Sequence, residues 1–173
     1  MNETMQTILS RRSCRKYADK QISEADLEHI LLAGTYAASG MGRQAAKIVV
    51  VQDPAVREQL RRMNAAVMGD PDLDPFYGAP TICVVLADPE VRTWNEDGSL
   101  VIGNLMLAAE SVGAASCWIH RAKEEFDSPE GKALLEKWGI PTHYRGVGHC
   151  ILGYADGPLP AARPRKDDYI VRV

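Results

Sequence analysis

Apolar residues recur at the three- and four-residue spacing of amphipathic helices in several parts of the chain. One such stretch follows Ser23, which together with Asp26 matches a capping box. Another is opened by Pro54, in the first-turn position that proline favours. These signals predict helices over residues 3–10, 24–34, 54–68, 97–115 and 129–138. The helix over 97–115 is apolar on most sides, which indicates a place in the core or at a subunit interface.

Short runs rich in β-branched residues alternate with these helices. They predict strands over residues 47–52, 81–86, 115–119 and 149–154. The segment 69–75 contains three aspartates and two prolines, and it is expected to be a surface loop. The order of elements favours an α+β fold, an α/β sandwich in which helices cover both faces of a sheet of about four strands.

Composition limits the classes of protein that need to be considered. A chain of 173 residues with 46% hydrophobic residues fits a single domain, residues 1–173, with a substantial core. A net charge of -3 argues against nucleic-acid binding, which usually needs a broad basic excess. The four cysteines are too widely spaced for a zinc site or a disulfide scaffold, so no metal is expected. With no visible signal peptide and no run of about 20 apolar residues, we expect a cytoplasmic protein without a membrane span.

Arginines are concentrated at the two ends of the chain. The stretch Arg11-Arg12-Ser13-Cys14-Arg15 places three guanidinium groups within five residues, and Arg163, Arg165 and Lys166 lie in the tail. Arginines at the end of a short helix can cap its free carbonyls. They can equally bind phosphate oxygens, to which the planar guanidinium donates two hydrogen bonds. If both ends of the chain meet in the fold, they would form one phosphate clamp.

Other motifs point to no specific chemistry. Residues 40–45 fit the pattern G-x-G-x-x-A, but a helix precedes them and a strand follows. That order is the reverse of a dinucleotide-binding fingerprint, so we reject this interpretation. Hydrolase motifs are missing, and the four histidines have no ligand spacing, which favours helix-surface or structural roles. The acidic pairs Glu124-Glu125 and Asp167-Asp168 are expected to be solvated.

Five segments together, in order and spacing, resemble the FMN-dependent nitroreductase family over nearly the whole chain. Residues 11–17 are similar to the family opening R-R-S-x-R-x-F/Y, and residues 38–44 to its segment A/P-S-x-x-N-x-Q-P-W. The others are Tyr77-Gly78-Ala79-Pro80 before a strand, residues 116–119 after the apolar helix, and residues 148–153 before the Arg-rich tail.

The resemblance implies an architecture and a cofactor. The fold would be nitroreductase-like, with a central mixed, largely antiparallel sheet of four to five strands flanked by helices and a C-terminal tail that extends to the partner subunit. The protein would be a homodimer with FMN at the subunit interface. NADH or NADPH would be the co-substrate, and a small electron-poor molecule such as a nitroaromatic or a quinone would be the acceptor.

The resemblance also implies FMN-binding positions. In the phosphate segment and the tail these are Arg11, Arg12, Ser13, Arg163 and Arg165. Around the flavin ring they are Arg15, near N1 and O2; Ser39 and Gly40, in a loop often supplied by the second subunit; Asn64, at the pyrimidine edge; and Ile119 and His120, whose backbone lies near N5. No side chain is expected to act as a nucleophile, and the role of Arg15 would be electrostatic.

A ping-pong reaction follows from this assignment, in which NAD(P)H reduces the flavin and leaves before the acceptor binds. The chain departs from the family pattern at Gly42, where asparagine is usual, and at Ala45-Ala46, which replace Pro-Trp. Two alternatives stay open. One is a specialised flavin branch, such as a reductive dehalogenase-like enzyme or one that destroys flavin. The other is a non-catalytic protein that binds or stores FMN or senses a phosphate ligand.

Overall fold

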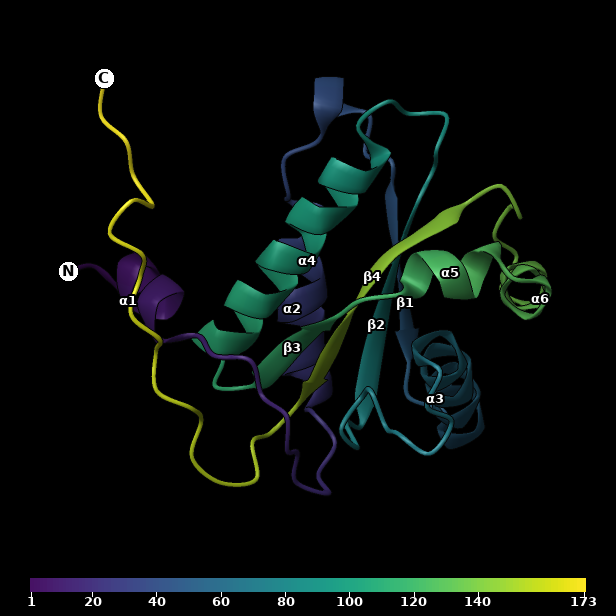
Figure 1. Ribbon diagram of the computed structural model, residues 1–173, viewed down its shortest axis with the longest axis horizontal. Coiled ribbons are helices and arrows are strands. Elements are labelled where there is room, and N and C mark those ends of the chain that lie inside the picture. The colour runs from purple at the N-terminus through teal and green to yellow at the C-terminus, as the bar shows by residue number, and fades with distance from the viewer.

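The computed structural model describes residues 1–173 as one four-stranded sheet with helices on both of its faces (Figure 1). The strands are β1 (Ala46–Val51), β2 (Thr81–Ala87), β3 (Ala115–Ile119) and β4 (Arg145–Gly153). They lie in the order β1-β2-β4-β3, and every neighbouring pair is antiparallel. The predicted α+β fold is therefore confirmed: the four strands pair antiparallel, and one isolated parallel bridge lies at the outer edge of β3.

Six α-helices and one 3-10 turn surround the sheet. They are α1 (Glu3–Ser10), α2 (Glu24–Thr35), η1 (Gly40–Gly42), α3 (Pro54–Met68), α4 (Trp94–Ser111), α5 (Ala122–Asp127) and α6 (Pro129–Lys137). Helices α2 and α4 cover one face of the sheet, and α3, α5 and α6 cover the other (Figure 1). None of these helices has the length and apolar character needed to cross a membrane.

The predicted helix signals are confirmed by the cap contacts. The hydroxyl of Ser23 accepts a hydrogen bond from the Asp26 backbone N–H, and Asp53 caps α3, with Pro54 in its first turn. Helix α4 starts three residues earlier and ends four residues earlier than predicted, because Gly113, with φ of 76°, turns the chain into β3. Helix α5 was not predicted, since six residues are too few for a clear periodic pattern.

Two hydrophobic clusters fill the space on the two faces of the sheet. Along β2, Ile82, Val84 and Leu86 pack toward the side of α3, α5 and α6, whereas Cys83 and Val85 pack toward α2 and α4. A strand buried on both faces is apolar throughout, which explains the uninterrupted run in the sequence. All four cysteines are free and buried.

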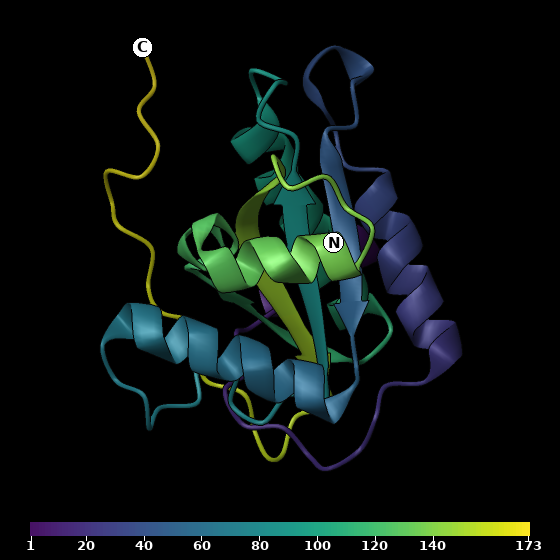
Figure 2. The same ribbon diagram turned by 90° about the vertical axis from the view of Figure 1, so that its right-hand side faces the viewer.

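The N-terminal segment after α1 lies along the outer edge of β3. Ser13 forms a parallel bridge with Ser116, and the Cys14 backbone N–H donates to the Ser116 carbonyl at 2.9 Å. Farther along, Tyr17 pairs with Ala155 beyond the end of β4. The tail over residues 157–173 is exposed throughout and extends away from the sheet (Figures 1 and 2).

Candidate functional site

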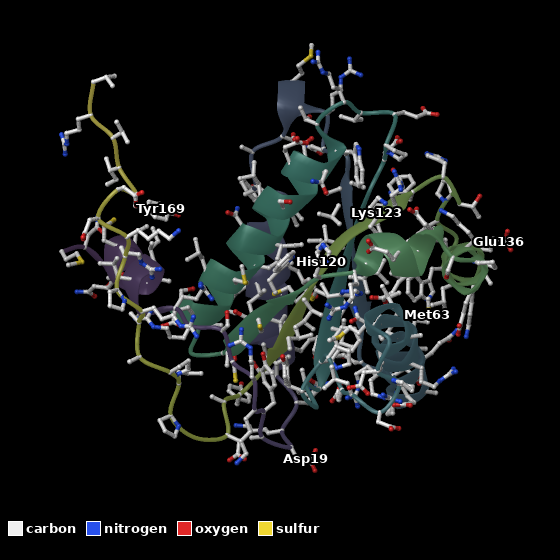
Figure 3. All side chains as sticks on the ribbon, in the orientation of Figure 1. Asp19, Met63, His120, Lys123, Glu136 and Tyr169 are labelled. Atoms are coloured by element: carbon white, nitrogen blue, oxygen red, sulfur yellow. The ribbon has the colours of Figure 1, made fainter.

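A cavity of about 270 Å³ lies at the C-terminal end of β3. Arg15 lines one side, Leu73 and Tyr77 from the loop after α3 line another, and residues 117–121 contribute the strand end and the following turn. Figure 3 shows His120 at this point, between the sheet and α5. The fold thus brings together Arg15, Ile119 and His120, three of the predicted flavin-binding positions, although Arg15 is more than 100 residues from the other two in sequence.

Arg11 and Ser13 lie beside this cavity, along the edge of β3. Burial raises the pKa of the Cys117 thiol, while a hydrogen bond from Ser13 and the positive charges of Arg15 and Arg11 partly lower it. Cys117 of β3 therefore lies close to Ser13, Arg15 and Arg11, three side chains predicted to bind the ligand. The chain folds this way locally because the extended segment after α1 hydrogen-bonds to the edge of β3.

The guanidinium of Arg11 contains a buried donor without a partner. Its Nη1 atom is enclosed and forms no hydrogen bond within the protein, and the nearby strand contains a second such atom, the Oγ of Ser116. Leaving buried polar groups unpaired costs free energy, so such groups usually mark a missing partner. An anionic group with several acceptor oxygens, such as a phosphate, would satisfy both the charge and the donor of Arg11.

Arg12 has a different role from its neighbour. Its Nη1 atom donates to the carbonyls of Leu9 at 2.7 Å, Ser10 at 3.0 Å and Arg11 at 2.7 Å. These carbonyls lie at the C-terminal end of α1, where a helix leaves them unpaired. Helix capping thus accounts for Arg12, whereas it does not account for Arg11.

Asn64 lies beneath the cavity rather than in its wall. Its side chain is fully buried. The Nδ2 atom donates to the His120 carbonyl at 2.9 Å and to Glu125 Oε1, and the Oδ1 atom accepts from Arg121 Nε at 2.8 Å. Asn64 does not line the cavity, because its polar atoms bond to His120, Arg121 and Glu125. The structure therefore does not bring it to the position predicted for the pyrimidine edge of the flavin.

The expectation that Glu125 is solvated is wrong. Only 1% of this residue is exposed, and His149, which is fully buried, lies with its Nε2 atom 3.4 Å from Glu125 Oε2. The error arose because an acidic pair normally marks an exposed helix face. The unpredicted helix α5 turns the second carboxylate inward.

Ser39 and Gly40 lie elsewhere in the same chain. The Gly40 backbone N–H donates to Asp97 Oδ1 at 2.9 Å in the first turn of α4, whereas Ser10, next to Arg11, bonds to Glu110 in its last turn. Helix α4 has 18 residues, and a helix of that length spans about 27 Å. A side chain at position 40 would collide with Thr93, since its Cβ would lie 2.2 Å from the Oγ1 atom.

These loop residues border a second, largely apolar cavity of about 340 Å³ between α2, β1 and α4. It contains Ser39 and Asp97 but none of the arginines predicted to bind a ligand. A single chain therefore does not join the 39–40 loop to Arg15.

Arg163 and Arg165 are also not brought to the site within one chain. Both lie on the exposed tail, and neither forms a hydrogen bond or an ion pair with the rest of the protein. Figure 3 shows Tyr169, farther along the tail, well away from the sheet. The two arginine sets therefore do not form a clamp within this chain.

Arg121 is a cavity residue that sequence reasoning missed. Its backbone has a φ of 79°, in the left-handed region, and it lies directly before α5. Such a conformation is uncommon for a residue other than glycine, asparagine or aspartate. The sequence therefore contains no turn signal at this position.

The fold and the site define an α+β sandwich with an arginine-lined cavity at one edge of its sheet, and comparison with known proteins identifies its family. The model of the Nitroreductase family matches residues 8–154, so the chain belongs to this family. The solved structure of a nitroreductase with bound FMN from Bacteroides fragilis is 34% identical, with a TM-score of 0.91 and 100% of both chains covered.

Two further relatives are named for an activity. An NADH dehydrogenase of Thermus thermophilus is 38% identical over 155 residues, covering 88% of this chain and 69% of the relative. An FMN reductase [NAD(P)H] of Bacillus subtilis is 28% identical over 188 residues, covering 96% of this chain and 69% of the relative. The resemblance seen in the sequence motifs is thus confirmed.

Proposed function

We propose that this member of the nitroreductase family is an FMN-dependent NAD(P)H oxidoreductase. The observation that carries the proposal is the buried, unpartnered Nη1 atom of Arg11 beside the cavity lined by Arg15 and residues 117–121. Bound FMN would supply the chemistry, by taking a hydride from NAD(P)H and passing it to an electron-poor acceptor in a ping-pong sequence.

The residues at the edge of β3 divide the binding task. Arg11 and Ser13 would hold the phosphate, because the buried Nη1 atom of Arg11 has no acceptor within the protein and Ser13 lies two residues farther along the same edge of β3. Arg15 would face the ring and stabilise negative charge that develops on it, since a permanent cation favours the reduced, anionic form of a ligand. The backbone of Ile119 and His120 would border the ring.

The protein would work as a homodimer. Ser39, Gly40, Arg163 and Arg165 would reach the FMN site of the partner subunit, because the fold of one chain keeps them away from Arg15. Exposed apolar side chains support this arrangement, since a lone chain leaves a large apolar area in contact with water. They lie on α1, α2, η1 and α4 and directly after α2: Met5, Ile8, Leu9, Leu32, Tyr36, Met41 and Leu100.

Anaerobic reduction of the FMN-loaded protein tests the activity. NADH or NADPH should bleach the flavin absorbance in stopped flow, and an acceptor panel of nitroaromatics, quinones and halogenated phenols should restore it. Parallel lines in double-reciprocal plots would support the ping-pong order. A protein that binds FMN and is not reduced would be a carrier or sensor instead, and a preference for halogenated phenols would indicate a dehalogenating branch. Failure to bind FMN would overturn the proposal.

Subunit mixing tests whether two chains share one site. The variants Arg11→Ala and Arg165→Ala damage the parts of the site assigned to different subunits. If the assignment is correct, a heterodimer has one site with both defects and one intact site. Random mixing of the two inactive variants, after dissociation and refolding together, should therefore restore about a quarter of the activity of the unmodified protein. Sites built within single chains would show no recovery.

A further inference from the structure

The turn between β3 and α5 is held in a conformation that its sequence does not favour. Arg121 has a φ of 79° and is followed at once by α5, which lacks a side-chain cap. For a non-glycine residue this left-handed backbone is disfavoured by about tenfold or more. Residues keep such conformations only where surrounding contacts determine them, and these contacts are most common at functional sites.

Asn64 supplies contacts on both sides of the strained peptide. Its Nδ2 atom donates to the carbonyl of His120 at 2.9 Å, and its Oδ1 atom accepts from the Arg121 side chain at 2.8 Å. One fully buried amide on α3 therefore fixes the carbonyl before Arg121 and the side chain of Arg121 itself. No other side chain of the protein hydrogen-bonds to these two residues.

Asn64 is in turn fixed by a buried acid–imidazole pair. Its Nδ2 atom also donates to Glu125 Oε1, and the other carboxylate oxygen lies 3.4 Å from His149 Nε2. Glu125 closes the loop of contacts, because its backbone N–H donates to the Arg121 carbonyl at 3.0 Å. The network thus joins α3, α5 and β4 around a single turn.

Burying this polar network in the core costs free energy. Glu125 Oε2 and both ring nitrogens of His149 have no well-formed hydrogen bond, although each residue is at most 1% exposed. Apolar residues of similar volume often stabilise a core at least as well as buried ionisable groups do. A core-filling role alone therefore does not explain why Asn64 and Glu125 stand at these positions.

We propose that Asn64, supported by Glu125, is a positioning residue that holds the His120–Arg121 turn in its left-handed form and so orients the backbone of this turn toward the 270 Å³ cavity. The inference deepens the proposed function and rests on it, because the flavin is the group that this turn would face. If this is so, the rate of flavin reduction depends on the backbone geometry of the His120–Arg121 turn, which the buried Asn64 side chain maintains from beneath the cavity.

Two substitutions at position 121 test this directly. Glycine adopts the left-handed conformation without strain, whereas alanine does not, and both remove the guanidinium. Both variants lose the contacts of the guanidinium, but Arg121→Ala should be reduced by NADH about tenfold more slowly than Arg121→Gly. Equal rates for the two variants would overturn the proposal, because the side chain and not the backbone would then be what matters.

A double-mutant cycle on the protein without FMN gives a readout that needs no activity. Asn64→Leu should destabilise the parent protein, and it should do so less in the Arg121→Gly background, where the turn needs no support. We expect a coupling of about fivefold or more in the unfolding equilibrium constant in urea. Strictly additive effects would overturn the proposal. If Asn64→Leu does not fold, the comparison of alanine with glycine at position 121 decides alone.

Gly139→Ala is the matched control. Gly139 has a φ of 68° after α6, away from the cavity, so alanine there adds a left-handed backbone penalty outside the site. This variant should lose stability without losing the reduction rate, which separates positioning from general destabilisation. If no variant or parent protein is reduced by NAD(P)H, the proposed function fails, whereas the coupling in the FMN-free protein still reports on the turn.

Discussion

Replacement of Arg11 by methionine should lower the affinity for FMN and yet stabilise the protein without FMN. The Nη1 atom of Arg11 is buried and has no acceptor, and an unmade buried hydrogen bond costs roughly 1–3 kcal/mol. Because Arg11 as a whole is only partly buried, the lower end of this range applies. Methionine keeps the apolar packing of the side-chain stem, so the free energy of unfolding should rise by about 1 kcal/mol.

The affinity should change in the opposite direction. A hydrogen bond to a charged group contributes about 1.5–3 kcal/mol, which corresponds to a Kd for FMN roughly 10 to 150 times higher in the variant. Quenching of FMN fluorescence on titration measures this Kd, and urea unfolding of the FMN-free protein at one fixed protein concentration measures the stability.

Arg12→Met is the matched comparison, since it removes an adjacent guanidinium with a different environment. Arg12 forms three hydrogen bonds to backbone carbonyls at the end of α1, so its loss should lower the free energy of unfolding by about 1 kcal/mol. Its effect on the Kd for FMN should be much smaller than that of Arg11→Met. The reasoning is refuted if Arg11→Met destabilises the FMN-free protein and leaves the Kd for FMN unchanged.

Four further substitutions probe the fold and the rim of the cavity. Gly131→Ala should destabilise the protein by about 1–3 kcal/mol in urea unfolding, because the new Cβ would lie 2.1 Å from a backbone carbonyl oxygen of α5. Gly103 has open space around it, so Gly103→Ala should stabilise α4 by roughly 0.5–1 kcal/mol in the same assay. A hydrogen bond from Arg145 holds the pKa of Asp127 below its ordinary value of 3.8, so this ion pair stabilises the fold above that pH and loses its effect as the pH falls below it. Asp127→Asn should therefore flatten the acid limb of a stability–pH profile by about 0.2–1 kcal/mol, and an unchanged profile would contradict this. Arg61 donates to two carbonyls of the loop after α3, at 3.1 and 2.8 Å. Arg61→Met should therefore raise KM for acceptors severalfold while leaving the Kd for FMN unchanged. A change in the Kd for FMN alone would argue against a role for this loop at the rim of the cavity.

The helices and strands were predictable where their signals are local. The Ser23 cap, the first-turn Pro54 and the apolar run of β2 each leave a pattern within a few residues, and the structure has an element at each place. Helix α5 was missed because its six residues are too short for a period, and its start at Arg121 lacks the usual turn residues. The inward orientation of Glu125 was missed for the same reason.

The chemistry of the site was predictable in type but not in arrangement. The sequence identified arginines suited to a phosphate, and it left capping and ligand binding open for the whole cluster. The structure separates the two neighbours, because Arg12 turns back onto α1 while Arg11 does not. This difference depends on where a helix ends relative to the edge of β3, which no local pattern specifies.

The sequence by itself determined the family, the elements and the candidate ligand-binding side chains, because motif spacing and periodic burial are properties of short segments. Only the tertiary structure decided which of these side chains meet. It placed Arg15 beside residues 117–121, kept Gly40 at the far end of α4, and enclosed Asn64 with Glu125. The physical reason is that these contacts join segments 57 to more than 100 residues apart, and the packing of helices against both faces of the sheet sets them.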